Sequence, residues 1–316
     1  MLGSIAFVFP GQGSQSLGML ADLASIHPLV QEVFTDASAA LGVDLWQLVQ
    51  EGPVERLNQT RLTQPAMLAA GYAVYRVWEE EGGSAPDFVA GHSLGEYTAL
   101  VVAEALDFAD AVRLVAERGR LMQEAVPEGE GLMAAVLGPD REQVEEILAR
   151  AIGDGEGVVS VANDNCPGQC VIAGSRSKVL RAIDLLKEAG VRKVLTLPVS
   201  VPSHTSLMHR AALSMKDLLS QVTLSSLSIP VVPNVTARPL KAGEASGEIR
   251  NLLVRQIESP VEWRRSVAGL LEDGVARFVE VGPGSVLTGL GKRIEKAVEP
   301  REKIIWESTD RKEDRT

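Results

Sequence analysis

One serine of this chain lies in a sequence pattern that is typical of an acyl-transfer nucleophile. Ser93 is the centre of the G-x-S-x-G motif Gly91-His92-Ser93-Leu94-Gly95, with one apolar run before it and another after it. This context predicts a strand, a sharp turn and a helix, and such a turn lifts the serine hydroxyl clear of the sheet edge. The start of the helix would offer backbone N–H groups to a developing oxyanion. We therefore expect acyl chemistry on Ser93, although many hydrolases share this motif.

A serine nucleophile also needs a base, and the sequence offers four histidines, His27, His92, His204 and His209. His204 lies where a strand is expected to meet the start of a helix, a place from which a base can reach an elbow serine. A histidine at a helix start can equally be satisfied by backbone groups alone. His92 is adjacent to Ser93, and neighbouring side chains on a sharp turn generally diverge. Position alone therefore leaves both interpretations of His204 open.

Arg118 is unusual because it interrupts the apolar stripe of a helix expected over residues 108–125, with Asp107 as its N-cap. An unpaired buried charge is very costly, so a guanidinium in that stripe needs a partner. A structural ion pair, or a long side chain that reaches water, is the simpler interpretation of this spacing. The functional alternative is a bidentate clamp on a substrate carboxylate.

Other polar residues give weaker signals. The loop at Gln12, between two glycines after the first expected strand, could supply a second oxyanion N–H group. On pattern alone, Gln256 is interpreted as a helix C-cap or surface residue. Asn165 and Asn234 are most simply turn residues.

The strands and helices expected along the chain alternate, and this order predicts a parallel α/β fold. Its strands are expected at 5–9, 87–90, 231–234 and 277–281, and its helices at 65–77, 108–125, 206–221, 247–257 and 260–273. Between them, the order β-α-β-β-α-β over about 131–198 predicts a ferredoxin-like split motif. We therefore expect one catalytic domain made of residues 1–126 and 199–316, with a small subdomain inserted at 127–198.

Composition excludes several classes of function. The chain has 316 residues, 45% of them hydrophobic, and 31 basic against 42 acidic side chains give a net charge of −11. Such a chain is a poor candidate for nucleic-acid or anionic-membrane binding. No run of about 18 apolar residues and no signal peptide are evident. Its two cysteines, Cys166 and Cys170, lack nearby histidines, so we expect reduced packing residues of a cytoplasmic protein and no metal site.

Several motifs, taken together and in order, resemble the malonyl-CoA:acyl carrier protein transacylases. They are Phe9-Pro10-Gly11-Gln12-Gly13-Ser14-Gln15, Gln64-Pro65-Ala66, Gly91-His92-Ser93-Leu94-Gly95-Glu96, Arg118-Gly119, Val201-Pro202-Ser203-His204 and Glu280-Val281-Gly282-Pro283-Gly284. The resemblance extends from Phe7 to about Arg293. It implies an α/β-hydrolase-like core that carries a ferredoxin-like subdomain.

The resemblance also implies a role for each matching residue. Ser93 would be the nucleophile and His204 the base, while Arg118 would pair with the free carboxylate of a malonyl group. The remaining roles are oxyanion N–H donors at Gln12 and Leu94, a carbonyl at Gln256 that orients His204 in place of the usual acid, and substrate-binding side chains at His92, Gln64 and Asn165. A monomer without a cofactor would then move malonyl from malonyl-CoA to the phosphopantetheine thiol of acyl carrier protein, by ping-pong kinetics, for fatty acid elongation.

Alternatives and departures remain at this point. A polyketide-system acyltransferase acting in trans, a serine acyl hydrolase or thioesterase, and an interaction module with an inactive site share parts of this pattern. Asp164 and Cys170 depart from the family pattern and, lying in the small subdomain, bear on substrate or carrier fit. The resemblance also implies an acidic carrier protein, so we expect a local basic surface, with Arg192-Lys193 and Lys292-Arg293 as candidates.

Overall fold

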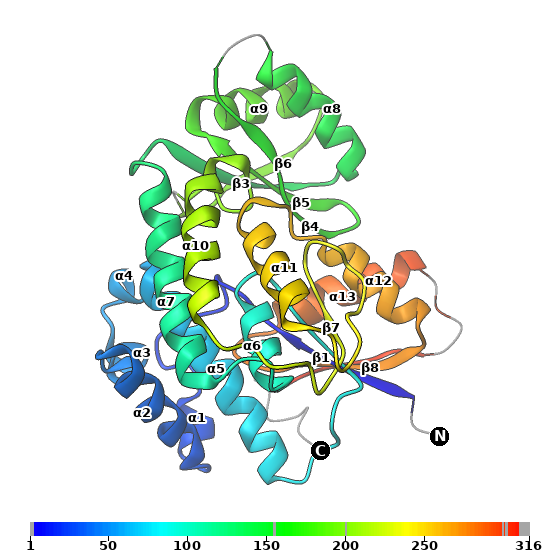
Figure 1. Ribbon diagram of the computed structural model, residues 1–316. Helices are drawn as coiled ribbons and strands as arrows, with labels where there is room; N and C mark the ends of the chain where they lie inside the picture. The colour runs from blue at the N-terminus through cyan, green and yellow to red at the C-terminus, as the bar shows by residue number, and fades with distance from the viewer. Residues whose placement is uncertain (1–2, 154–155, 200, 299, 301–302, 310–316) are drawn as a thin grey trace.

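Two β-sheets organise the described part of the chain, which comprises residues 3–153, 156–199, 201–298, 300 and 303–309 of a computed structural model (Figure 1). One sheet has five strands in the order β7-β2-β1-β8-β9, and the other has four in the order β4-β5-β3-β6. The helices of the five-stranded sheet form the larger body, and the four-stranded sheet lies at one end of it.

Every neighbouring pair of strands in the larger sheet is parallel. The strands are β1 Ser4–Phe9, β2 Phe88–Gly91, β7 Val231–Val232, β8 Val275–Glu280 and β9 Ile305–Ser308. A parallel sheet is normally covered on both faces, and the central strand β1 is accordingly almost wholly apolar and buried. The predicted parallel α/β core is confirmed, while β9 was not anticipated from the sequence.

Alternate side chains of β1 divide the core of this sheet into two layers. Phe7 and Phe9 join the larger cluster on one face, whereas Ala6 and Val8 join the cluster on the other. This follows from the two-residue period of a strand. The helices are α1 Ala21–Ala24, α2 Leu29–Leu41, α3 Leu45–Glu51, α4 Val54–Leu57, α5 Thr60–Glu80, α6 Gly95–Val102, α7 Phe108–Ala125, the 3₁₀ turn η1 Ser206–Met208, α10 His209–Gln221, α11 Ser246–Glu258, α12 Trp263–Glu272 and α13 Val286–Val298.

The sequence prediction missed α1, α2, α3, α4 and α13 and set some helix ends wrongly. The helix expected over 65–77 runs from Thr60 to Glu80, and the one expected over 260–273 begins at Trp263. The predicted N-cap of α7 is confirmed, because the Asp107 carboxylate accepts a hydrogen bond from the backbone N–H of Asp110 at 3.0 Å. Within the described chain, no helix combines the length and apolar character that crossing a membrane requires.

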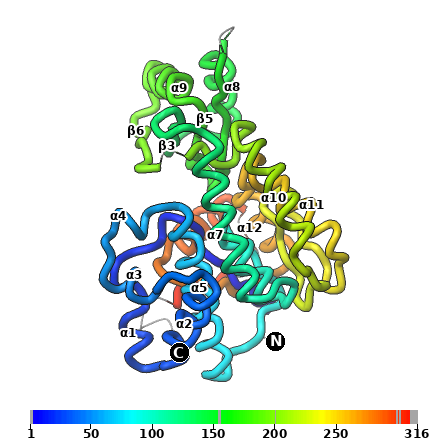
Figure 2. The backbone as a smooth tube through the Cα atoms, turned by 60° about the vertical axis from the view of Figure 1, so that its left-hand side comes forward, coloured from blue at the N-terminus to red at the C-terminus, as the bar shows by residue number. Residues whose placement is uncertain are grey.

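The four-stranded sheet is antiparallel and has the predicted ferredoxin-like order of elements. Its elements are β3 Gly131–Leu137, α8 Arg141–Ile152, β4 Val159–Cys166, β5 Gln169–Ser175, α9 Arg176–Glu188 and β6 Lys193–Thr196. Helices α8 and α9 pack on one face of this sheet, and α7 leads from the larger body toward it (Figure 2). These elements lie inside the predicted limits 127 and 198, which themselves stay a prediction.

Strand β4 also connects the two bodies. Asp164 donates its backbone N–H to the Val261 carbonyl, and Val261 donates to Ala162, both at 2.9 Å. Cys166 packs in a core layer of the large sheet and Cys170 in the core of the small one, and both are buried and free.

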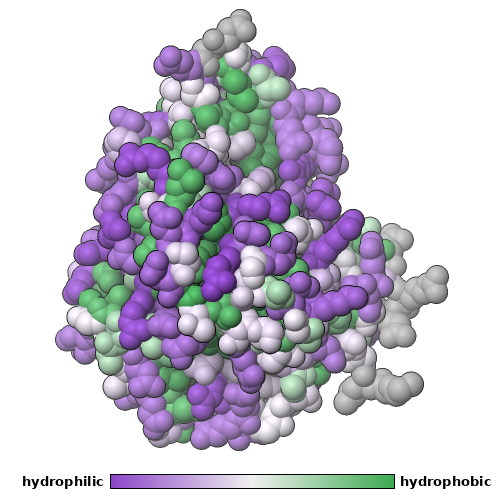
Figure 3. Space-filling view, viewed as in Figure 1, coloured by the Kyte–Doolittle hydropathy of each residue, from purple (hydrophilic) through white to green (hydrophobic). Residues whose placement is uncertain are grey.

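Polar residues dominate the face of the molecule in Figure 3. Apolar residues are exposed there only in small groups, including some on the lobe of the small sheet.

Candidate active site

Ser93 lies on a sharp turn between β2 and α6, as the motif predicts. Its backbone φ of 52° is in the left-handed region, which a residue with a side chain rarely adopts. A Cβ atom on Gly91 would overlap the backbone of Gly95, and one on Gly95 would overlap the carbonyl of Phe9. Glycine is therefore required on both sides of Ser93, because the turn leaves no room for side chains.

Asn234 fastens this turn from the neighbouring strand. It follows β7, which pairs with β2, so the carboxyl ends of the two strands meet at one sheet edge. Its side-chain oxygen accepts the Ser93 N–H, and its side-chain nitrogen donates to the Gly91 carbonyl, each at 2.6 Å. Asn234 does lie in a turn, as its residue type indicated, but it is only 1% exposed and its side chain belongs to the site.

His204 lies in hydrogen-bond contact with the serine. The distance from Ser93 Oγ to His204 Nε2 is 2.8 Å, and His204 Nδ1 lies 2.8 Å from the carbonyl oxygen of Gln256. A carbonyl can only accept, so Nδ1 carries the proton and Nε2 is free to accept from the serine hydroxyl. Burial, together with the nearby positive charge of Arg118, lowers the pKa of His204 to about 3. The imidazole is therefore neutral at pH 7, the form in which it can act as a base.

Gln256 connects the serine, the histidine and the arginine. It is fully buried in α11, which corrects its interpretation as a C-cap or surface residue. Besides the carbonyl contact with His204, its side-chain nitrogen donates to the Ser93 carbonyl at 3.0 Å. Its side-chain oxygen accepts from Arg118 Nη2 at 3.0 Å. The backbone and the side chain of Gln256 thus contact different members of the site.

Arg118 is a buried cation surrounded by neutral acceptors. It is 1% exposed, and its guanidinium donates to Gln64 Oε1 at 2.9 Å, to Gln256 Oε1 and to Ser93 Oγ at 3.2 Å. Its guanidinium also lies over the Tyr97 ring, with 5.4 Å to the centroid. Among the described residues none of the ion pairs involves Arg118. The expectation of a structural ion pair or of a side chain that reaches water is therefore wrong.

A cavity of 240 Å³ opens in front of Ser93, between the large sheet and the free face of the small one. Its wall includes every predicted site residue except Gln256, namely Gln12, Gln64, His92, Ser93, Leu94, Arg118, Asn165 and His204. The backbone N–H groups of Gln12 and Leu94 make none of the hydrogen bonds found among the described residues. Both are thus available to a ligand oxygen in the cavity.

Comparison with known proteins decides the family. The model of the acyl transferase domain family matches residues 6–305. This chain belongs to the acyl transferase domain family. It is 54% identical to the malonyl CoA-acyl carrier protein transacylase of Escherichia coli (strain K12) over 289 residues, which are 92% of each protein. It is 42% identical to the protein of the same name from Bacillus subtilis (strain 168), over 93% of this chain and 92% of the relative.

Solved structures agree with this assignment. The malonyl-CoA:acyl carrier protein transacylase of Xanthomonas oryzae pv. oryzae superposes with a TM-score of 0.93 at 49% identity, over 98% of this chain and 96% of the other. A malonyl-transacylase solved in complex with its type II PKS acyl-carrier protein also gives 0.93, at 47% identity, over 99% and 97%.

The remaining histidines of this acyl transferase domain have other partners. His92 Nε2 lies 2.9 Å from Asn165 Oδ1, so its ring faces the small sheet instead of the serine hydroxyl. Asn165 is buried within β4, which corrects its interpretation as a turn residue. His27 lies beside two glutamates of α5 and its C-cap, and His209 pairs with Glu258 at 2.8 Å. Among the described residues, no group of His, Cys, Asp or Glu is arranged to hold a metal ion.

Sequence reasoning missed Glu96 and Asn234 as members of this acyl transferase site. Glu96 is 2% exposed and accepts the Asn234 backbone N–H and the Gln256 side-chain amide, each at 2.9 Å. One signal was present for Glu96, an acidic residue beside the nucleophile at the start of an otherwise apolar segment. Asn234 follows a strand end, and only its pairing with β2 shows that this end lies beside the nucleophile.

Proposed function

We propose that this chain moves a malonyl group from malonyl-CoA to the phosphopantetheine thiol of acyl carrier protein, through a malonyl ester on Ser93. The observation that carries this proposal is the position of Arg118, buried without a carboxylate partner and 3.2 Å from Ser93 Oγ. Only three bonds separate the ester oxygen of a malonyl-serine from its carboxylate carbon. A cation this close to the nucleophile therefore suits a short acyl group that ends in a carboxylate. The names of the relatives point to the same acyl group.

In the first half-reaction, His204 Nε2 takes the proton of the Ser93 hydroxyl as its oxygen attacks the thioester carbonyl of malonyl-CoA. The Gln256 carbonyl holds the Nδ1 proton and stabilises the imidazolium that forms. The thioester C–S bond then breaks, and CoA leaves as a thiol with the proton from His204. The product is a malonyl ester on Ser93.

In the second half-reaction, the phosphopantetheine thiol takes the place of the CoA thiol. His204 accepts the thiol proton as sulfur attacks the ester, and it returns that proton to Ser93 Oγ as the C–O bond breaks. The same residues thus serve both thiols, which gives ping-pong kinetics. Each step is an acyl transfer, so the mechanism needs no cofactor.

The developing oxyanion would be held by the backbone N–H groups of Gln12 and Leu94. Both line the cavity beside Ser93, on the loop after β1 and at the start of α6. One such donor contributes about 2.7–4 kcal/mol to transition-state stabilisation. Gln64 would hold the second guanidinium nitrogen of Arg118 in place, and His92 with Asn165 would form the facing wall for the malonyl group.

A serine acyl hydrolase is the main alternative activity. A generic hydrolase has no need of a buried guanidinium beside its nucleophile, which favours transfer of a dicarboxylic acyl group. The carrier belongs to fatty acid elongation in our proposal, and the type II PKS carrier bound to one structural neighbour makes a polyketide carrier the alternative acceptor.

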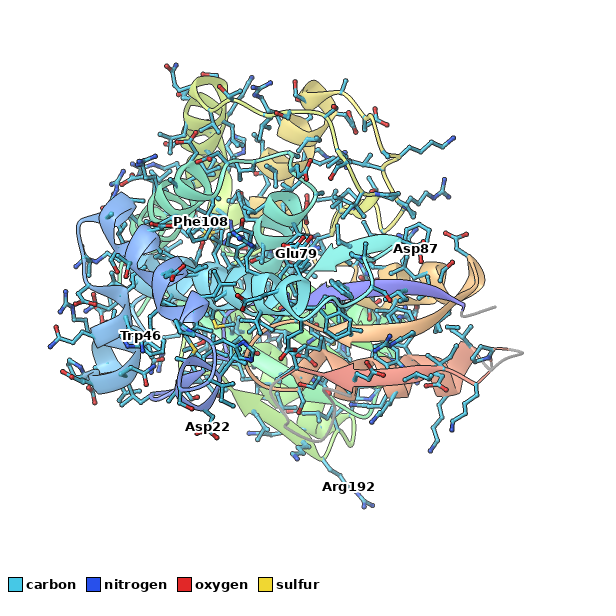
Figure 4. The ribbon with its side chains drawn as sticks, turned by 90° about the horizontal axis from the view of Figure 1, so that it is seen from below. Asp22, Trp46, Glu79, Asp87, Phe108 and Arg192 are labelled. Carbon is cyan, nitrogen blue, oxygen red and sulfur yellow. The ribbon has the colours of Figure 1, made fainter. Side chains whose placement is uncertain are left out.

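The carrier would meet basic residues near the mouth of the cavity. Arg293 of α13 donates to Gln169 Oε1 at 2.6 Å and to the Pro167 carbonyl at 2.8 Å, next to the cavity wall. The Arg192 side chain extends outward at the edge of the molecule (Figure 4). Charge reversal of Arg192-Lys193 and Lys292-Arg293 should slow transfer to carrier at low salt while leaving malonyl loading intact. Unchanged transfer would contradict this docking surface.

The decisive experiment is intact-protein mass spectrometry after exposure to malonyl-, methylmalonyl- and acetyl-CoA. We expect stoichiometric malonyl addition to the wild type and none to Ser93→Ala. Adding holo carrier should remove the label by transfer, and faster loss to water than to carrier would favour the hydrolase. A full label on Ser93→Ala would refute the assigned nucleophile.

A further inference from the structure

Glu96 is a buried carboxylate that the reaction steps above do not use. It lies in the first turn of α6, three residues after the nucleophile, and is 2% exposed. One oxygen, Oε2, accepts both the backbone N–H of Asn234 and the side-chain nitrogen of Gln256. No ion pair of the described residues involves Glu96, so its charge is balanced only through these contacts and the more distant Arg118.

The side-chain amide of Gln256 has a donor end and an acceptor end that are not interchangeable here. Its Nε2 faces two groups that accept, the Ser93 carbonyl and Glu96 Oε2, while its Oε1 faces the donating Arg118 Nη2. Because Oε2 already accepts the Asn234 backbone N–H, it is an acceptor in either charge state of Glu96, and a proton on the carboxyl group would lie on Oε1. Glu96 therefore holds the nitrogen end on its own side and turns the oxygen end toward the guanidinium.

A reversed amide would damage the site in two ways. It would place an NH₂ group against the Arg118 Nη2 donor and leave the guanidinium without one of its three acceptors. It would also place Oε1 against the Ser93 carbonyl. An unpaired donor in a buried site is costly, because it has lost its hydrogen bonds to water. Arg118 would have to shift, and a displaced guanidinium would no longer face the carboxylate of an acyl group on Ser93.

We propose that Glu96 is a positioning residue for malonyl selectivity, because its Oε2 atom fixes the orientation of the Gln256 amide and, through that amide, the place of the Arg118 guanidinium. This inference rests on the proposed malonyl transfer. Glu96 does not touch the substrate. It acts through one side chain, and an acceptor atom in the place of Oε2 is what that role requires.

The charge of Glu96 adds a second consequence. Burial raises its pKa to about 7, against the lowering effect of the two hydrogen bonds and of Arg118. The other titratable groups around it are the Tyr97 phenol, whose pKa burial raises to about 12, and His204 beyond Gln256, whose pKa is lowered to about 3. Between pH 6 and 8, Glu96 is thus the group of this set that changes charge. Above pH 7 its negative charge opposes the malonyl carboxylate on the other side of Arg118.

The test uses two substitutions that separate the acceptor atom from the charge. Glu96→Gln keeps an oxygen that can accept from Gln256 and Asn234 but cannot ionise, whereas Glu96→Met fills the space without an oxygen acceptor. The measured quantity is the ratio of kcat/KM for malonyl-CoA to that for acetyl-CoA, in which effects common to both substrates cancel. Glu280→Gln is the matched control, since Glu280 is another buried carboxylate that accepts backbone N–H groups, at the start of α13.

We expect Glu96→Met to lower the malonyl-to-acetyl ratio at least about tenfold, while Glu96→Gln stays within about twofold of wild type at pH 6. In the wild type the ratio should fall several-fold from pH 6 to pH 8, and in Glu96→Gln it should stay flat. Glu280→Gln should change both substrates in proportion, even where it lowers stability.

An equal loss for both substrates in Glu96→Met would show a merely structural role and overturn the inference. A loss in Glu96→Gln as large as in Glu96→Met would do so as well, because the acceptor atom alone should suffice. Failure of the proposed function looks different, since the wild type would then gain no malonyl mass on Ser93 in the first place.

Discussion

Two arginine clusters lie on opposite sides of one short piece of β4, and their surroundings differ. On one side Asn163 and Asn165 line the cavity where the Arg118 guanidinium meets only neutral oxygen atoms. On the other side Asp164 meets Arg264 Nε at 2.9 Å and Arg141 Nη1 at 3.7 Å. Arg141 also reaches Glu262 at 2.8 Å, which joins α8 of the small sheet to the start of α12. The second cluster is therefore paired within the protein, and the first is not.

The difference shows how to separate a binding cation from a structural one. Burying a charge without a counter-charge is costly, so a fold retains such a group where a ligand completes it. A paired cluster at a junction needs no ligand, and its partners come from both sides of the contact that it holds. We therefore expect loss of Arg118 to change selectivity, and loss of Arg264 to change stability.

The largest effect should follow from Arg118→Ala. Removing two charge-assisted hydrogen bonds to the malonyl carboxylate should lower kcat/KM for malonyl-CoA about 100-fold or more, with a much smaller effect on acetyl-CoA. Lysine carries a point charge and lacks the planar guanidinium, so kcat/KM of Arg118→Lys for malonyl-CoA should lie between the values of the wild type and of Arg118→Ala. Steady-state kinetics with both acyl-CoA substrates measure the ratio. A variant that kept the wild-type preference would show that Arg118 is not the clamp.

Arg264→Met tests the paired cluster. It would leave the Asp164 carboxylate, whose side chain is 3% exposed, without its hydrogen-bonded partner. Losing a buried ionic partner typically costs 3–5 kcal/mol, and because Arg264 is itself partly exposed we expect about 1–3 kcal/mol. Urea unfolding would measure this loss, and the malonyl-to-acetyl ratio should stay near the wild-type value.

The stability lost in Arg264→Met should also depend on pH. Burial already raises the pKa of Asp164 above its ordinary value, and removing Arg264 raises it further. A carboxyl group with a raised folded-state pKa destabilises the fold when it ionises, so stability is lost as pH rises. The deficit of Arg264→Met should therefore be larger at pH 8 than at pH 5. A deficit that grew toward pH 5 would contradict this account of the cluster.

The sequence predicted the parts of this comparison that depend on local pattern. The glycines around Ser93, the N-cap of α7 and the place of Arg118 in an apolar stripe can each be read within a few residues. The contacts that Asn234 and Gln256 make with Glu96, and that Gln256 makes with the Ser93 carbonyl, cannot, because they join positions 138 to 163 residues apart in the chain. The resemblance to transacylases supplied the Gln256 carbonyl. The pattern of polar and apolar residues around Gln256 alone would have placed it at a helix end or on the surface.

A similar limit applies to the fold. The β-α-β-β-α-β order could be predicted because apolar residues recur with a different period in strands and in helices. The parallel sheet followed from the alternation of strands and helices along the chain. Strand β9 has only four residues, and Ile305 within it is 48% exposed. Its place beside β8 depends on tertiary contacts, among them the stacking of Trp306 on Phe278 at 4.2 Å. No local signal distinguishes such an edge strand from a loop.

The smallest effect on stability should come from an exposed ion pair, which has the same kinds of charged group as the cluster around Asp164 but is not buried. Arg120 of α7 contacts Glu124 at 2.6 Å, with side chains 43% and 60% exposed. Water already solvates both groups, so Glu124→Ala should change the free energy of unfolding by less than about 0.5 kcal/mol. The same urea titration serves as the control for Arg264→Met. A loss as large as that of Arg264→Met would mean that burial does not decide what an ion pair contributes here, and that the distinction between the two clusters fails. A small loss of unfolding free energy in Glu124→Ala, reduced further by added salt, would show that an exposed ion pair contributes little. The larger contribution of Arg264 would then come from the burial of its partner Asp164.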